Sequence, residues 1–495
     1  MKRSLHRIVV AGALAWTAGC ATGPDFQPPA APRSASYGAA EDGGRTAEAR
    51  GPGGASQRFD AALDVPAAWW ELFGCEALDA SVREALENSP TLAQATARLR
   101  QAQEEYHAAA GAARYPAVDT GLSAARKKVN PEAMGMTGVP TPDPFSLFNA
   151  SVSVSYAFDL FGRNRRALEG LKAQVDLREY EQEGVRQTLA ANVVLACIRQ
   201  AELEKQLAVA RDVEAARSEQ RAIAEARCQA GGISTLELER QGLLLEQARA
   251  ALPALENQHE RLCRQLAVYL GREPAAAARD SMDLDALRLP EDLPLAVPSE
   301  LARKRPDIRA AEAVWHRACA NVGVATANLF PQIALSASLG SQTTDAADLL
   351  GSLNVWSLGA DLMQPVFRGG ELRARKRGAV AAYDEAAAAY RETTLRGLQE
   401  VADVLGALAA DARTLESRTA AANHAKAGME IATRQREQGG LAPAALLDEK
   451  IRWLQTESDR VQAQASRYAD TAALFHALGG GWVSLGASAS TPESE

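Results

Sequence analysis

Alternating apolar and polar positions mark several short segments of the chain. Residues 150–158 read ASVSVSYAF, so the valines, Tyr156 and Phe158 fall on one side and the serines on the other. The stretches QIALSASL (332–339) and NVWSLGADL (354–362) repeat this two-residue period, and a fourth such segment is expected just after Pro116. This pattern predicts four β-strands, each with one apolar and one polar face.

The longest segments instead carry apolar residues at every third or fourth position. Residues 165–229 and 371–438 are each predicted to form one helix of about 65 residues, because this rhythm runs through them without a break. At 1.5 Å per residue such a helix is roughly 100 Å long, which is too long for a compact globular domain. The spacing, for example at Leu189, Val193 and Ala196, predicts side-by-side packing as in a coiled coil.

Shorter helices complete the pattern. They are predicted over 75–112, 235–270 and 299–328, and from the GGLAP stretch to Leu478. The paired glycines Gly231-Gly232 and Gly439-Gly440 separate each long helix from the helix that follows. Glycine commonly ends helices in this way, so each pair predicts the turn of a helical hairpin.

The same landmarks occur twice in the same order. AARYPAV at Ala112 corresponds to ANLFPQI at Ala327, and CQAGGISTLEL at Cys228 corresponds to EQGGLAPAALL at Glu437. Five such landmarks, separated by about 206–216 residues, predict an internal two-fold repeat with two strands in each copy.

The N-terminus has the order of a secretory signal peptide. Lys2, Arg3 and Arg7 precede an apolar run over 8–18, and small residues then lead to Cys20. The sequence TAGC resembles a bacterial lipobox, which predicts that Cys20 becomes the lipidated first residue and carries diacylglycerol and palmitate. An ordinary signal peptide with an incidental cysteine is the alternative.

These features predict five segments. They are a signal peptide (1–19), a lipid-anchored N-terminal segment (20–68), a first repeat (69–298), a second repeat (299–482) and a flexible C-terminal tail (483–495).

Composition excludes several classes of function. The formal net charge of −8 gives no basic patch for nucleic acid. The five cysteines after Cys20 are scattered and predict no disulfide framework. The six histidines are dispersed, with no HExxH, GxSxG or P-loop sequence. We therefore predict no enzyme, no metal site and no cofactor apart from the lipid at Cys20.

Four strands alone would leave two open edges. Closing into a membrane barrel removes the edges and satisfies the backbone in lipid, and membrane barrels usually have at least eight strands. Several chains are therefore required, and three would supply twelve strands. A soluble four-stranded sheet that caps a coiled coil is the alternative.

Taken together, the motifs of the chain resemble the outer-membrane efflux (TolC-like) family, in its OprM/NodT-like lipoprotein branch. The resemblance covers nearly the whole mature chain and is carried, in order, by GCATGPDFQPP, WWELFGCEALDASVREAL, DLFGRNRR, RPDIRAAE, LFPQIALSASLG, QPVFRGGELRA and ALGGGW. It implies a mainly α-helical homotrimer with a twelve-stranded outer-membrane β-barrel and a long α-helical coiled-coil barrel in the periplasm. It also implies the exit duct of a tripartite efflux pump, which passively conducts small molecules from a periplasmic adaptor and an inner-membrane transporter of the RND type.

The resemblance further implies where partners would meet this chain. Gly231, Gly232, Gly439 and Gly440 would lie at the periplasmic tip that contacts the adaptor, and Asp448 in ALLDEK would be an aperture residue. Simple helix termination is the alternative for the glycines, and a solvated surface carboxylate is the alternative for Asp448. A type I protein-secretion duct and a pore-less lipid-anchored coiled-coil protein remain alternative functions.

Overall fold

The computed structural model describes residues 22–481, except 31, 33, 35, 38–43, 139, 277–281, 350 and 352. The chain forms two units, one from Met1–Pro29, Arg98–Arg178 and Ala311–Tyr390, the other from Ala30–Ala97, Glu179–Ala310 and Arg391–Glu495. Each unit therefore combines segments from both halves of the sequence. The predicted signal peptide, Cys20 and the C-terminal tail after residue 482 lie outside the described residues.

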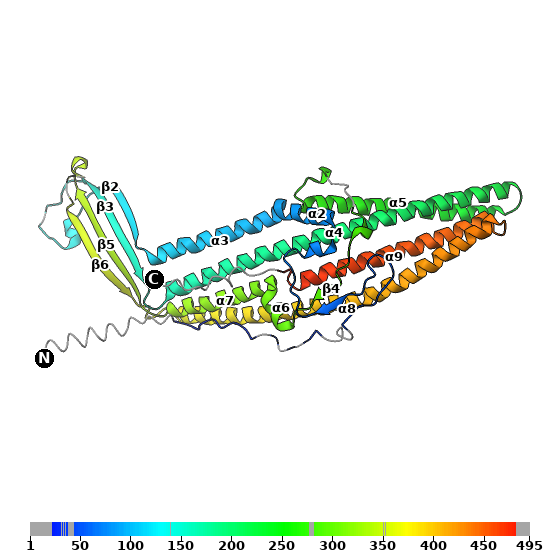
Figure 1. The fold of residues 1–495 in the computed structure, drawn as a ribbon. Helices are drawn as coiled ribbons and strands as arrows, with labels where there is room; N and C mark the ends of the chain where they lie inside the picture. The colour runs from blue at the N-terminus through cyan, green and yellow to red at the C-terminus, as the bar shows by residue number, and fades with distance from the viewer. Residues whose placement is uncertain are drawn as a thin grey trace. The chain divides into compact units, whose positions relative to one another are not determined.

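The first unit contains a four-stranded antiparallel sheet with the strand order β2-β3-β5-β6 (Figure 1). Its strands are β2 (Ala117–Lys127), β3 (Phe145–Phe158), β5 (Gln332–Thr343) and β6 (Val355–Met363). All four predicted strands are therefore confirmed, and β3 begins five residues before the alternating stretch from which it was predicted.

One end of this sheet joins four helices. Helix α3 (Pro90–Arg114) leads into β2 and α7 (Pro306–Ala327) leads into β5, while α4 (Arg163–Gln229) follows β3 and α8 (Glu371–Glu437) follows β6. Because neighbouring strands are antiparallel, these four junctions lie at the same end of the sheet. The connections over 128–144 and 344–354 lie at the opposite end.

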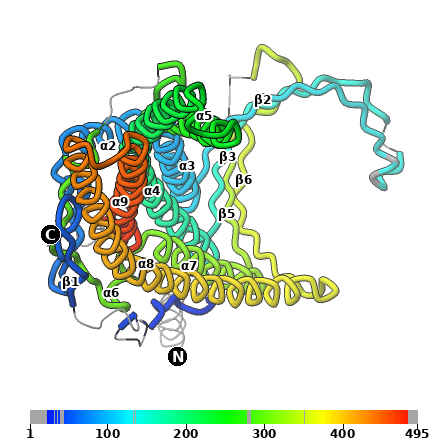
Figure 2. The backbone as a smooth tube through the Cα atoms, turned by 90° about the vertical axis from the view of Figure 1, so that its right-hand side faces the viewer, coloured from blue at the N-terminus to red at the C-terminus, as the bar shows by residue number. Residues whose placement is uncertain are grey.

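The second unit contains two helical hairpins. Helices α4 and α8 each have 67 residues, and α5 (Thr235–Tyr269) and α9 (Pro443–Ala477) each have 35. Within this unit α5 returns beside α4 and α9 returns beside α8, as Figures 1 and 2 show. Ion pairs such as Arg249–Glu214 (3.0 Å) and Arg418–Asp459 (2.7 Å) join the paired helices. The predicted long helices and the helices that follow them are confirmed.

The main hydrophobic core also lies in the second unit. Trp69, in the short 3-10 helix η2 (Trp69–Phe73), stacks on Phe475 of α9 with ring centroids 5.4 Å apart. Leucine, valine and alanine side chains from α2 (Glu76–Asn88), α4, α5, α8 and α9 surround this aromatic pair. A two-stranded parallel sheet of β1 (Arg58–Asp60) and β4 (Asp292–Pro294) completes the unit.

Two helices that were predicted as single are each divided in two. The segment 75–112 forms α2 and α3, and the segment 299–328 forms α6 (Pro298–Lys304) and α7. The residues before the prolines, Ser89 and Arg305, are extended, with ψ of 121° and 125°. Pro90 and Pro306 cause these breaks, because proline lacks an N–H and disfavours helical backbone in the preceding residue.

The remaining elements are short. Further 3-10 turns occupy Pro131–Met134, Pro274–Ala276, Leu284–Ala286 and Ala346–Asp348. The five cysteines of the described ranges form no disulfide. Within the same ranges, no helix is both long enough and apolar enough to cross a bilayer.

Candidate functional site

The register of the sheet places its apolar side chains on one face. Val152 lies opposite Leu339, which in turn lies opposite Trp356, and directly opposed residues of antiparallel strands share a face. The same face carries Val118, Leu122, Phe148, Val154, Tyr156, Phe158, Ile333, Leu335, Leu358 and Leu362. We call this surface the apolar face.

The opposite surface, which we call the polar face, carries small and polar side chains. Its members include Asp119, Gly121, Ser151, Ser153, Ser155, Ser336, Ser338, Ser357, Gly359 and Asp361. The hydroxyl oxygens of Ser338 and Ser357 lie 2.8 Å apart and share a hydrogen bond. The predicted separation of serines from valines is therefore confirmed, and this face is suited to contact with water.

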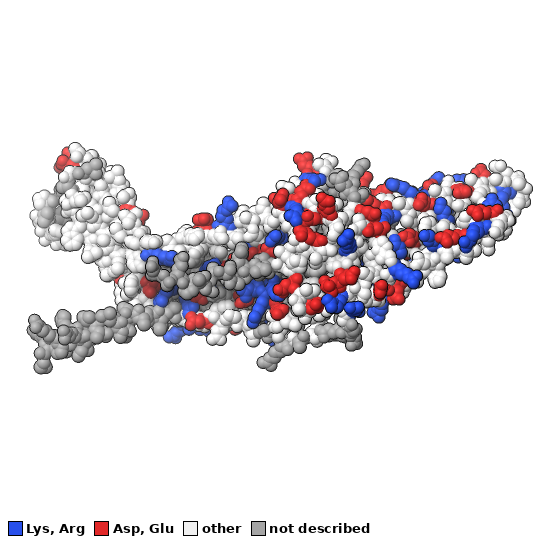
Figure 3. All heavy atoms as spheres, in the orientation of Figure 1, with Lys and Arg blue, Asp and Glu red and all other residues white. Residues whose placement is uncertain are grey.

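In a single chain both faces and both edges of the sheet are open. Trp356 and Leu358 on the apolar face are 78% and 79% exposed, and few charged side chains cover the sheet in Figure 3. An exposed apolar surface of this kind marks a membrane or protein contact. In addition, among the residues that the structure describes, β2 and β6 each pair with a single neighbouring strand, so their outer backbone groups can accept a further strand.

Both helical hairpins turn through the same capping geometry. Gly232 N–H donates to Arg227 O at 2.8 Å, and Gly440 N–H donates to Gln435 O at 2.8 Å. Gly231 and Gly439 have φ of 72° and 76°, the left-handed conformation that glycine adopts at the end of a helix. The predicted hairpin turns at these four glycines are confirmed as structure, whereas contact with an adaptor stays a prediction.

A side chain at Gly232 or Gly440 is predicted from the sequence either to protrude or to force an unfavourable φ. The structure favours protrusion, because the positive φ angles belong to Gly231 and Gly439. A Cβ added at Gly232 would lie 3.3 Å from Arg227 O, and one at Gly440 would lie 3.5 Å from Gln435 O. A side chain at Gly440 can therefore project in ordinary contact, and one at Gly232 needs a shift of a few tenths of an ångström.

Asp448 lies near the start of α9 and contacts α4. Its Oδ1 accepts a hydrogen bond from Gln220 Nε2 at 2.8 Å and lies 3.6 Å from Arg217 Nη1. Beside it, Leu447 and Ile451 pack against Ala216. The Asp448 side chain is 56% exposed, so it joins the two hairpins on one side and faces solvent on the other. The role of Asp448 at an aperture stays a prediction.

Sequence reasoning missed a buried polar cluster in the second unit. Arg467 of α9 is fully buried, and its Nη2 donates to Thr46 Oγ1 (2.9 Å) and to Ala55 O (2.7 Å). Nearby, burial and then repulsion from Asp411 raise the pKa of Asp470 from its ordinary value of 3.8 to about 7. Asp411 and Asp470 lie on different helices, so no local pattern in the sequence could have paired them.

This carboxyl pair predicts that the protein loses stability as the pH rises. A carboxyl group whose pKa is raised by folding contributes stability that is complete below its unfolded pKa of 3.8 and is lost as pH passes about 7. Asp470→Asn should therefore raise Tm clearly more at pH 8 than at pH 5, because only part of the loss has occurred at pH 5. Thermal unfolding of the detergent-solubilised protein at both values measures this, and an equal shift at the two values would contradict it.

A second missed residue is Arg305, which is 7% exposed. Its guanidinium donates to Ala477 O at the end of α9 (2.7 Å), to both carboxylate oxygens of Asp307 (2.8 and 3.0 Å) and to Glu400 Oε2 (2.7 Å). Arg305 therefore joins α8 and α9 to the break between α6 and α7. Within the described residues, no group of three or more His, Cys, Asp or Glu side chains is arranged to hold a metal ion.

Comparison with known proteins identifies the family of this chain. The family model described as "Outer membrane efflux protein" matches residues 81–272 and 297–480. The chain belongs to this family. The pyoverdine export outer membrane protein OpmQ of Pseudomonas aeruginosa is 33% identical over 423 residues, which cover 84% of this chain and 88% of OpmQ.

Other relatives agree over most of the chain. The toluene efflux pump outer membrane protein TtgI of Pseudomonas putida is 29% identical over 477 residues, covering 95% of this chain and 97% of TtgI. The solved outer-membrane channel OprN superposes with a TM-score of 0.79 at 29% identity, covering 94% of this chain and 100% of the OprN chain. The Campylobacter jejuni channel CmeC has a TM-score of 0.80 at 20% identity, which shows the shared fold.

The efflux protein is thus an outer-membrane channel component that serves as the exit duct of an efflux pump and reaches into the periplasm. This confirms the predicted family, location and exit-duct function. The role of this family is transport across the outer membrane.

Proposed function

We propose that three copies of the efflux protein assemble into one duct, with their sheets closed into a twelve-stranded β-barrel. The open edges of β2 and β6 carry this proposal, because a barrel pairs every edge. The apolar face then contacts lipid, and the polar face with its serines lines a water-filled lumen. Four strands from one chain cannot enclose such a lumen.

The helices continue this duct into the periplasm as a coiled-coil barrel made of two repeats per chain. The equal lengths of α4 and α8 and of α5 and α9 support the duplication. So do the two matches to the same family model and the proline-induced breaks before α3 and α7. Each repeat supplies two strands and one helical hairpin.

Small organic molecules are the proposed cargo. Two relatives are named for pyoverdine export and for toluene efflux, and both names describe release of small molecules rather than of proteins. The proposed partners are a periplasmic adaptor and an inner-membrane transporter of the RND type, which supplies the energy. The duct itself is passive and performs no catalytic step.

The oligomeric state and conductance test this proposal directly. Light scattering of the purified protein, corrected for bound detergent, should give three copies of the 52.5 kDa chain, less the mass removed with the signal peptide. Planar bilayers containing the same sample should conduct ions. A protein that stays monomeric, or a trimer that conducts no current, would refute the barrel.

The hairpin turns are proposed to contact the adaptor. Gly232→Arg combined with Gly440→Arg should lower export of an efflux dye while the trimer level stays normal, because these positions project without a positive φ. The matched control, Gly232→Ser with Gly440→Ser, adds little bulk and should export normally. Normal export by the arginine variant at normal trimer level would show that the tip does not form this contact.

The lipid anchor at Cys20 is also a proposal, supported by the TAGC sequence after the apolar run. Mass spectrometry of the mature N-terminal peptide should show an acylated cysteine, and Cys20→Ser should remove radiolabelled palmitate from the protein. Palmitate that stays with the Cys20→Ser protein would refute the anchor.

A further inference from the structure

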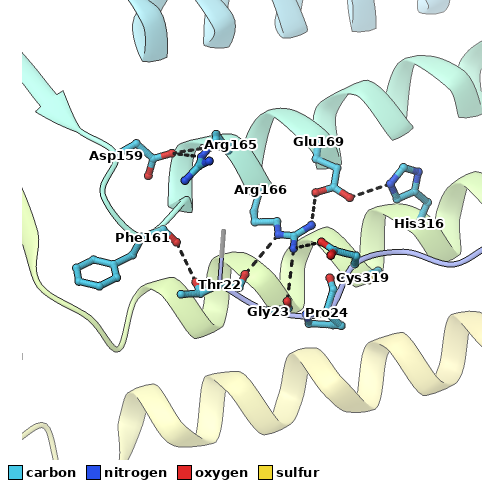
Figure 4. Close-up of polar contacts among 11 residues, drawn as sticks. Thr22, Gly23, Pro24, Asp159, Phe161, Arg165, Arg166, Glu169, His316 and Cys319 are labelled. Carbon is cyan, nitrogen blue, oxygen red and sulfur yellow. Dashed lines mark hydrogen bonds and ion pairs between the residues drawn. The ribbon is translucent and has the colours of Figure 1, made fainter. Parts of the chain in front are cut away.

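Residues 22–26, the first described part of the chain, lie against α4, α7 and the turn after β3 (Figure 4). The centre of this contact is Arg166 of α4, which is 5% exposed. Arg166 Nε donates to Thr22 O at 3.3 Å, and Nη2 donates to Gly23 O at 3.4 Å and to Asp25 Oδ1 at 2.5 Å. A buried guanidinium thus directs most of its donors at this terminal segment. Its Nη1 donates to Glu169 on the same helix at 2.7 Å.

Contacts on both sides of Arg166 extend this attachment. Thr22 donates through its N–H and its hydroxyl to Phe161 O, at 3.2 and 3.0 Å. The Cys319 thiol of α7 donates to Pro24 O at 3.5 Å. The Phe26 ring stacks on His316 with centroids 4.5 Å apart. The segment therefore contacts helices from both halves of the sequence.

Two glycines allow the segment to approach this closely. Gly23 has φ of 102°, and a Cβ built there would lie 2.5 Å from the Cα of Gly323 on α7. A Cβ built on Gly323 would lie 2.7 Å from Arg166 Cγ. Both distances are too short for real atoms, so a side chain at Gly23 would clash with backbone and one at Gly323 would displace the Arg166 side chain.

We propose that residues 22–26 form a latch, and that Arg166, Cys319 and Gly323 are its receptor site on α4 and α7. Terminal segments are usually poorly ordered unless specific contacts hold them, and here the contacts converge on a buried arginine and include three backbone carbonyl groups of the segment. The latch closes α4 of the first half against α7 of the second half. Arg166 is therefore a positioning residue for the N-terminus.

Alkylation of Cys319 tests the latch, because this thiol is 1% exposed and contacts the segment. Outer membranes are treated with N-ethylmaleimide, and the modified cysteines are quantified by peptide mass mapping. Gly23→Ala and Arg166→Met should each raise the alkylation rate of Cys319 about tenfold or more, because each opens the contact. Arg166→Lys keeps the charge but loses the planar set of donors. The alkylation rate of Cys319 in this variant should therefore lie between those of the wild type and Arg166→Met.

Matched controls separate latch opening from general damage. Gly51→Ala has nearly the same φ, 103°, but an added Cβ there meets nothing within 4 Å. Arg165→Met changes a half-exposed arginine in the same turn. In both control variants Cys319 should be alkylated at the wild-type rate. The buried Cys263 of the second unit should be alkylated at its wild-type rate in every variant.

Two outcomes would overturn the latch. One is an unchanged Cys319 rate in both Gly23→Ala and Arg166→Met. The other is a Cys319 rate that rises only together with that of Cys263. An N-terminal peptide without an acyl group would instead refute the lipid proposal alone, since protection of Cys319 is measured independently of it.

Discussion

Leu358→Arg should prevent assembly of the efflux protein in the outer membrane, whereas Ser357→Arg should not. Leu358 lies near the middle of β6 on the apolar face, opposite Ala337, and is 79% exposed in the single chain. An arginine on the lipid-facing side of a barrel costs about 2–4 kcal/mol near the bilayer midplane. The proposed trimer would incur this cost in each of its three chains, which is a large fraction of ordinary folding stability.

Ser357 is the matched control because it is the adjacent residue on the opposite face. It pairs with Ser338 on the polar face, where water in the proposed lumen would solvate a guanidinium. Trimer levels in purified outer membranes should fall strongly for Leu358→Arg and remain near wild type for Ser357→Arg, which should instead alter single-channel conductance. Equal assembly of the two variants would contradict the assignment of the faces.

The strands and long helices could be predicted because each is determined by a pattern of apolar and polar residues within its own segment. Alternation in ASVSVSYAF determines a face at every second residue, and an apolar residue at every third or fourth position determines one side of a helix. The turns at Gly231 and Gly439 were also predictable, since a left-handed residue after a helix strongly favours glycine. The breaks before Pro90 and Pro306 follow from the backbone limits of proline, but helical periodicity on both sides of each proline favours a single helix.

The buried polar residues could not be predicted, because their partners are distant in sequence. Arg467 reaches Thr46 and Ala55 from more than 400 residues away, and Arg166 reaches Asp25 across 141 residues. A lone arginine on a helix is usually solvated, so only the folded chain reveals which arginines are buried. The motif RPDIRAAE supported the family resemblance without indicating that Arg305 is bonded to the end of α9.

Arg305→Met should destabilise the second unit more than other single changes at its polar contacts. The variant would leave Ala477 O, Asp307 and Glu400 without their shared donor. Breaking a buried ion pair on one side costs about 3–5 kcal/mol. The cost here should be at the lower end of this range, because the Asp307 and Glu400 side chains are 48% and 42% exposed. Thermal unfolding of the detergent-solubilised protein should show Tm lower by roughly 5 °C.

Arg303→Met provides the control for this change. Arg303 lies two residues earlier in α6 and is exposed, so its loss removes the same charge without uncovering buried acceptors. The Tm of Arg303→Met should stay close to that of the wild type. The Tm of Arg305→Lys should lie between those of the wild type and Arg305→Met, since an ammonium group cannot reproduce the planar set of hydrogen bonds to three acceptor groups. If Arg303→Met and Arg305→Met lowered Tm equally, the effect would come from net charge, and Arg305 would not be the residue that joins α8 and α9 to the α6–α7 break.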